Sequence, residues 1–223
     1  ANIINSSRQW IINGVVQPST ANPFPFTFTS PGLYTIELVI CDDSPSCDTF
    51  TRVDYINAFG LPSPSLSVSP GVGCAPLSVN ITDNSTPECG IMTSTTIFPN
   101  NGGPNLNGSG TVTYNTPGNY NIRIRLVNAC GCIKDPTYNN IVRVNQVPNA
   151  NFNAANRNSC TSPHTVNFSN TSSGGANSYL WDFGDGTTST AANPSHTYTS
   201  GNYTVRLIAT NTVTGCADTF LRS

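Results

Sequence analysis

Three stretches of this 223-residue chain repeat one pattern of apolar and polar positions. In each, an alternating run leads into a glycine-containing turn and then a tyrosine, which is Tyr34, Tyr120 or Tyr203. After each tyrosine the apolar residues fall at every second position, as in a strand that buries one face. The stretches are residues 26–38, 112–124 and 196–207. Each is therefore predicted to form a strand, a turn and a second strand.

The spacing of the three tyrosines predicts the domain organisation. They recur roughly every 85 residues, a length that suits a seven-stranded sandwich. The predicted repeats are residues 1–59, which lack most of the strands expected before Trp10, residues 60–147, and residues 148–223, which end inside the last strand. The joints between repeats are short and contain proline, so we expect an elongated array of semi-rigid beads.

Composition limits the fold class and the partners. Charged residues make up 9% of the chain, where a typical soluble domain has about 25%. The 18 glycines and 17 prolines, with many Asn, Ser and Thr residues, suit short strands and turns and not helices. A net charge of -2 gives no footprint for nucleic acid, and no apolar run is long enough to span a bilayer. We predict an all-β protein that binds no nucleic acid and does not insert into a membrane.

Eight cysteines in such a chain indicate disulfides and an oxidising, extracellular location. A zinc site would need paired C-x-x-C clusters, and the closest pair, Cys130 and Cys132, is one residue too tight. Two bridges are predicted between equivalent positions of their repeats, one between the cysteines unique to the second repeat, and one between the remaining pair. They are Cys160–Cys216, Cys74–Cys132, Cys89–Cys130 and Cys41–Cys47.

The third repeat carries the most specific motif. Residues 181–186 read W-D-F-G-D-G, and they are followed by H-x-Y at residues 196–198 and G-x-Y-x-V at residues 201–205. This repeat resembles a PKD domain, and the two earlier repeats share its register. The resemblance implies immunoglobulin-like β-sandwiches in tandem, as in surface-layer proteins, adhesins and secreted hydrolases. In style the chain is also similar to the very large cell-surface proteins of Bacteroidetes, including gliding-motility adhesins.

Some PKD domains bind calcium through acidic residues in the loop before the tryptophan strand. Here that loop, residues 171–177, has no carboxylate, although calcium sites need several oxygen ligands. Asp182 and Asp185 remain as candidate calcium ligands, and we interpret them as a solvated strand residue and a turn former. Trp181 and its counterpart Trp10 are expected in the cores. No cofactor is expected.

The sequence offers no supported catalytic site. His164 has no partner in sequence, and His196 occupies a position that is apolar in the other repeats. Asp42 and Asp43 are interpreted as turn residues, and no nucleophile motif of the G-x-S-x-G type is present. Tyr55 and Tyr138 could be exposed, but two scattered rings do not make a glycan-binding platform. We expect a protein that is not an enzyme.

These observations favour a non-catalytic stalk or adhesin segment of a large protein on a bacterial cell surface, supporting adhesion or surface motility. Its expected partners are neighbouring repeats of the same protein, and surface glycans or other cell-surface proteins. The alternative is an accessory spacer or carbohydrate-binding module of a secreted hydrolase. The flanking sequence would separate the two, through further repeats and a sorting domain or through a hydrolase motif.

Overall fold

The computed structural model describes residues 7–42 and 46–223. The regular secondary structure in this part of the chain consists of β-strands alone. Among these residues there is no helix with the length and apolar character needed to cross a membrane. The chain divides into two compact units, one of residues 1–65, 84–95 and 124–135 and the other of residues 66–83, 96–123 and 136–223. The predicted all-β fold class is confirmed.

The first sheet has the strand order β2-β1-β3-β4. Its strands are β1 (Ser7–Ile12), β2 (Val15–Val16), β3 (Gly32–Cys41) and β4 (Cys47–Ala58). All neighbouring strands are antiparallel, and Trp10, Leu38 and Phe50 stand side by side across the sheet. Cross-strand partners share a face of a sheet. One face is therefore apolar along this row.

The middle sandwich, residues 66–145, has two sheets. One has the order β5-β7-β9, with β5 (Leu66–Ser69), β7 (Leu77–Asp83) and β9 (Gly110–Tyr114). The other has the order β11-β10-β12-β6, and β8 also pairs with β10. Its strands are β6 (Val72–Cys74), β8 (Met92–Phe98), β10 (Gly118–Asn128), β11 (Ile133–Lys134) and β12 (Thr137–Asn145). The rings of Tyr114 and Tyr120 lie 4.5 Å apart between the two sheets.

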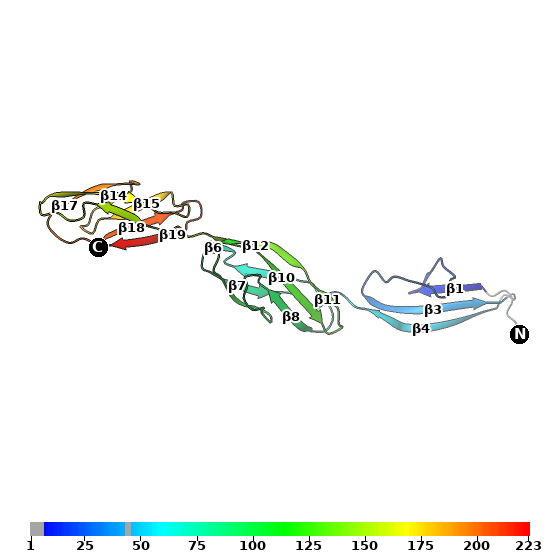
Figure 1. The fold of residues 1–223 in the computed structure, drawn as a ribbon. Coiled ribbons are helices and arrows are strands. Elements are labelled where there is room, and N and C mark those ends of the chain that lie inside the picture. The colour runs from blue at the N-terminus through cyan, green and yellow to red at the C-terminus, as the bar shows by residue number, and fades with distance from the viewer. Residues whose placement is uncertain (1–6, 43–45) are drawn as a thin grey trace. The chain divides into compact units, whose positions relative to one another are not determined.

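The C-terminal sandwich, residues 149–222, repeats this plan (Figure 1). Its three-stranded sheet is β13 (Phe152–Ala155), β14 (His164–Asn170) and β17 (Ser195–Tyr198). The four-stranded sheet has the order β16-β15-β18-β19, with β15 (Ser178–Asp182), β16 (Thr188–Ser189), β18 (Val205–Thr210) and β19 (Ala217–Arg222). Both sheets contribute to one buried core: Phe152, Val166, Phe168, Trp181, Phe183, Tyr198, Val205 and Leu207.

The three tyrosines that set the sequence register have the same structural role. The hydroxyls of Tyr34 and Tyr120 each donate to the carbonyl four residues earlier, at 2.7 Å. The Tyr203 hydroxyl donates to the Ser200 carbonyl at 3.5 Å. Each ring packs against an aromatic residue six or five positions before it, at 4.5 or 4.6 Å. All three tyrosine hydroxyls thus bond the backbone of the preceding turn, and the turn before Tyr203 is one residue shorter than the other two.

The two tryptophans are equivalent in position but differ in burial. Each indole N–H donates to a carbonyl further along the chain, that of Ala21 at 3.3 Å and that of Ala191 at 2.9 Å. Trp181 is completely buried, whereas Trp10 is only half-buried and stacks on Phe24. The expectation of a core residue thus holds for Trp181 and is wrong for Trp10, because the described residues of the first repeat form no second sheet that covers the apolar row. The repeat boundaries at 59/60 and 147/148 stay predictions.

Candidate functional site

The W-D-F-G-D-G motif lies at the end of β15 and in the turn that leads to β16. Oδ1 of Asp185 accepts hydrogen bonds from the backbone N–H and the hydroxyl of Thr187, at 3.0 and 2.6 Å. Its Oδ2 lies 2.7 Å from Nε2 of His196. The His196 ring stacks flat on Phe183, with ring centroids 4.1 Å apart. His196 is therefore a packing residue, as predicted, and it also holds the turn through Asp185.

Asp182 and Asp185, the candidate calcium ligands, are both engaged by protein groups. Oδ1 of Asp182 accepts from the backbone N–H of Gly184, and its Oδ2 accepts from the Arg206 guanidinium, both at 3.1 Å. The Thr187 hydroxyl and then His196 lower the pKa of Asp185 to about 2. Within residues 7–42 and 46–223, no three His, Cys, Asp or Glu side chains gather in a way that could hold a metal ion. The oxygens that a cation would need already stabilise the turn.

The two glycines of this turn have backbone conformations that favour glycine. Gly184 has φ +80°, and a Cβ built there would lie 2.5 Å from the carbonyl oxygen of Thr204. Gly186 has φ +90° with open space around the same position. A side chain is strained at either position, and at Gly184 it would also collide with the backbone.

The described part of the chain contains three disulfides. Cys41–Cys47 and Cys89–Cys130 are two of the four predicted bridges. The third joins Cys74 to Cys216, at a sequence separation of 142. Cys132 and Cys160 are free thiols, Cys132 partly buried and Cys160 exposed.

The predicted bridges Cys160–Cys216 and Cys74–Cys132 are therefore wrong. Cys160 lies in the hairpin between β13 and β14, and His164 after it pairs with Tyr198 at one end of the sandwich. Cys216 lies in the turn between β18 and β19, at the opposite end. The seven residues of β14 span about 23 Å, whereas bonded cysteines have Cα atoms within about 7 Å. Cys74 is in turn occupied by Cys216 and cannot bond Cys132.

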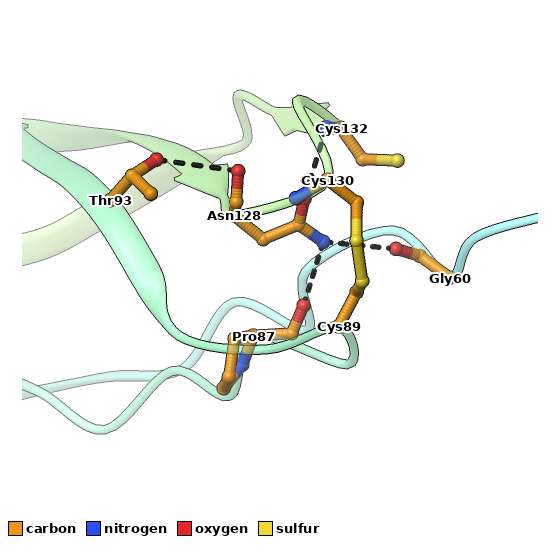
Figure 2. Close-up of a disulfide and its surroundings, with 7 residues drawn as sticks. All are labelled: Gly60, Pro87, Cys89, Thr93, Asn128, Cys130 and Cys132. Atoms are coloured by element: carbon orange, nitrogen blue, oxygen red, sulfur yellow. Dashed lines mark hydrogen bonds between the residues drawn. A yellow bond between two sulfur atoms is a disulfide. The ribbon is translucent and has the colours of Figure 1, made fainter.

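Asn128 is a buried polar residue that the sequence analysis did not single out (Figure 2). Its Nδ2 donates to the carbonyls of Gly60 and Pro87, at 3.1 and 2.8 Å. Its Oδ1 accepts from the backbone N–H groups of Cys130 and Cys132, at 3.2 and 3.0 Å. A signal was present, because Asn128 and Asn211 each lie eight residues after their register tyrosine.

The remaining candidates are scattered. His164 hydrogen bonds through Nε2 to the carbonyl of Asn156. Tyr55 is 63% exposed, and its ring and that of Phe50 both lie under the Arg52 guanidinium, at 5.6 and 5.0 Å. Tyr138 is half-buried, and burial raises its pKa. Asp43 lies outside the described residues. The exposed Phe50 and Tyr55 pair on β4 is a feature that the sequence analysis missed.

Comparison with known proteins shows that the C-terminal sandwich is similar to PKD domains. The profile of the PKD domain family matches residues 145–220. A stretch of 31 residues, 14% of this chain and 3% of the relative's length, is 71% identical to collagenase ColA of Bacillus cereus. The solved PKD1 domain of the Vibrio cholerae metalloprotease PrtV is 40% identical, covering 34% of this chain and 91% of that domain with a TM-score of 0.29.

Immunoglobulin-like ectodomains also match along the chain. The mouse nectin-like molecule 4 ectodomain is 12% identical, covering 98% of this chain and 92% of that one with a TM-score of 0.35. The specific match, however, is the family profile, and within it the Trp181 motif, the Asp185–His196 pair and the Tyr203 corner meet around one core. Residues 145–220 form a PKD domain.

Proposed function

We propose that this chain is a non-catalytic spacer segment of a large extracellular bacterial protein, in which PKD-type sandwiches follow one another in an elongated array that supports adhesion or surface motility. The observation that carries the proposal is the Cys74–Cys216 bridge. It ties a hairpin of the second predicted repeat to a turn of the third. A covalent bond between successive repeats suits a stalk that keeps its repeats in line under load, and disulfides fit an extracellular location.

The chemistry of the histidines supports a non-catalytic role. In a nucleophile–His–Asp triad the acid bonds one ring nitrogen and the nucleophile bonds the other. Here the Asp185 carboxylate and the Thr187 hydroxyl both approach Nε2 of His196, at 2.7 and 3.4 Å. The acid therefore occupies the nitrogen that a nucleophile would use. PKD domains are typically accessory domains without catalytic activity.

A second candidate is an accessory module of a secreted hydrolase. The local identity to a collagenase favours it. If it is correct, the isolated chain should sediment with collagen fibrils or with an insoluble polysaccharide. The matched variant is Phe50→Ala with Tyr55→Ala, because this exposed aromatic pair flanks a guanidinium on β4. Binding that this double variant abolishes would favour the module over the stalk.

Small-angle X-ray scattering tests the stalk. A compact chain of this length has a radius of gyration of about 17 Å. Three beads of about 30 Å each, in line, give about 26 Å. We expect the oxidised chain to have a radius of gyration near the value for three beads in line. A radius of gyration near the value for a compact chain would contradict the array.

A further inference from the structure

The two free cysteines are the counterparts of the two that form the long-range bridge. Cys74 lies three residues before Leu77, which pairs with Tyr114. Cys160 lies four residues before His164, which pairs with Tyr198 in the same way. Both cysteines therefore lie in the connection that leads into the second strand of the three-stranded sheet, Cys74 as the last residue of β6 and Cys160 outside any strand. One is bonded and the other is an exposed thiol.

The turn cysteines correspond equally well. The backbone N–H of Asn128 donates to the Cys132 carbonyl at 3.2 Å, and that of Asn211 donates to the Cys216 carbonyl at 2.8 Å. The same hydrogen bond thus closes the turn that carries each cysteine. Cys216 is bonded to the hairpin cysteine of the preceding repeat, whereas Cys132 is free.

Cys47 is the turn cysteine of the first repeat, and unlike Cys132 and Cys216 it has a partner cysteine on the neighbouring strand. Cys47 follows Tyr34 at the same interval as Cys216 follows Tyr203. It is bonded to Cys41, which stands opposite it on β3. The position of Cys41, seven residues after the tyrosine, is Val127 in the second repeat and Thr210 in the third. A turn cysteine that lacks this local partner is therefore available to form a disulfide with a cysteine of another repeat, as Cys216 does.

We propose that Cys160 is the bonding site for the turn cysteine of a further PKD-type repeat, so that the Cys74–Cys216 bridge is one link of a repeating inter-domain disulfide relay. The partner is a sandwich with a cysteine at the Cys216 position. By the same rule, Cys132 takes the hairpin cysteine of a preceding repeat. This proposal rests on the proposed function, because it requires further repeats next to those of this chain.

The surroundings of Cys160 leave room for such a partner. It borders an open cavity at the end of the C-terminal sandwich, whose lining also includes Arg157, His164, Tyr203 and Arg222. The hairpin thiol is exposed on the rim of this cavity. A turn from another domain can therefore approach Cys160 without displacing the core.

The bond forms by two thiol–disulfide exchanges. A small-molecule disulfide such as oxidised glutathione accepts the thiolate of one cysteine and releases one glutathione thiol. The second cysteine's thiolate then attacks the mixed disulfide, forms the new S–S bond and releases the second glutathione thiol. Two protein thiols are oxidised and one glutathione disulfide is reduced to two thiols, so atoms and electrons balance.

The test extends the whole chain by a second copy of residues 140–223 placed after Ser223. In that copy Cys160→Ser removes a competing thiol. Val213→Ala marks the mass of the peptide that carries Cys216, at a side chain that is 86% exposed. The protein is oxidised with glutathione disulfide, alkylated with iodoacetamide and digested without reduction. We expect the Cys160 peptide joined to the marked Cys216 peptide, and loss of Cys160 alkylation relative to the unextended chain.

The control carries Cys216→Ser in the appended copy, and it should restore alkylation of Cys160. Near-ultraviolet circular dichroism establishes that the appended copy is folded. Alkylated Cys160 beside a folded copy, or Cys160 joined to Cys216 of its own repeat, would overturn the relay.

Should the appended copy not fold, Cys74→Ser in the unextended chain frees Cys216 of a folded molecule. Covalent dimers linked Cys160–Cys216 would then support the proposal, and a purely monomeric product would overturn it. An extended particle in scattering with a free Cys160 would leave the array standing and remove only the relay.

Discussion

Replacing Asn128 by alanine should loosen the turn that holds Cys130 and Cys132. The side chain makes four hydrogen bonds to backbone groups and is 1% exposed. Each bond contributes about 1 kcal/mol net, and a buried partner left without one costs about 1–3 kcal/mol. Because the carbonyls of Gly60 and Pro87 can regain water once the side chain is gone, we expect a loss of about 3 kcal/mol and not the full sum.

Native-state hydrogen exchange measures this loss where it occurs. A chain of several domains does not unfold in two states, so a single melting temperature would mix their contributions. Since about 1.4 kcal/mol corresponds to a factor of ten, the amides of Cys130 and Cys132 should exchange on the order of 100-fold faster in Asn128→Ala. The peptides of the C-terminal sandwich should be unchanged.

Two further variants test whether the lost hydrogen bonds of Asn128 cause the faster exchange. Asn211→Ala is the matched control, because its Oδ1 accepts from two backbone N–H groups in the equivalent turn, and it should cost about half as much. Asn128→Asp keeps the acceptor and replaces the donor by an oxygen that faces two carbonyls. Burial and these carbonyls raise the pKa of a carboxyl there, so its penalty should be largest at neutral pH and shrink in acid. Unchanged exchange in Asn128→Ala would refute the reasoning.

Three other predictions concern the C-terminal sandwich, the first in comparison with the first sheet. Trp181→Ala should cost about 3–5 kcal/mol by hydrogen exchange of β14, and Trp10→Ala clearly less by exchange of β3, because the Trp181 ring is buried and the Trp10 ring only half-buried. Gly184→Ala should destabilise more than Gly186→Ala in denaturant unfolding, since only the first adds a backbone collision to an unfavourable φ. Asp185, with its pKa lowered to about 2 from 3.8, contributes stability that is present above pH 3.8 and lost as the pH falls toward 2. After a discount for solvent screening, Asp185→Asn should be less stable by about 1–2 kcal/mol at neutral pH and match the parent near pH 2, and a constant difference across this range would contradict the assignment.

The features that could be predicted from the sequence are those set by neighbours in the chain. The alternation after Tyr203 depends on strand periodicity, and the turn at Asp185 depends on the residues next to it. The packing role of His196 followed from the apolar residues at its position in the other repeats. The burial of Trp181 followed from its place in the motif. The same reasoning failed for Trp10, because its burial depends on a second sheet and not on its own strand.

The long-range bridge Cys74–Cys216 could not be predicted, unlike the bridges Cys41–Cys47 and Cys89–Cys130, because it depends on strand direction. Cys160 and Cys216 recur in register with Cys74 and Cys132, and this repetition suggested bonds within each repeat. A hairpin cysteine and a turn cysteine, however, lie at opposite ends of β14 and β18. Sequence equivalence identified Cys74 with Cys160 and Cys132 with Cys216. Only the fold shows that Cys74 bonds Cys216, across the predicted repeat boundary.

A relay of this kind changes how far an array can extend. Once a repeat has unfolded, tension follows the shortest covalent path, which in the C-terminal sandwich runs from Cys216 back to Cys160 and not over the whole repeat. At about 3.5 Å per residue, these roughly 56 residues reach about 200 Å, whereas the roughly 85 residues between successive register tyrosines reach about 300 Å. Because Cys160 and Cys216 both lie between strands, this shorter tether limits extension without constraining the fold that it protects.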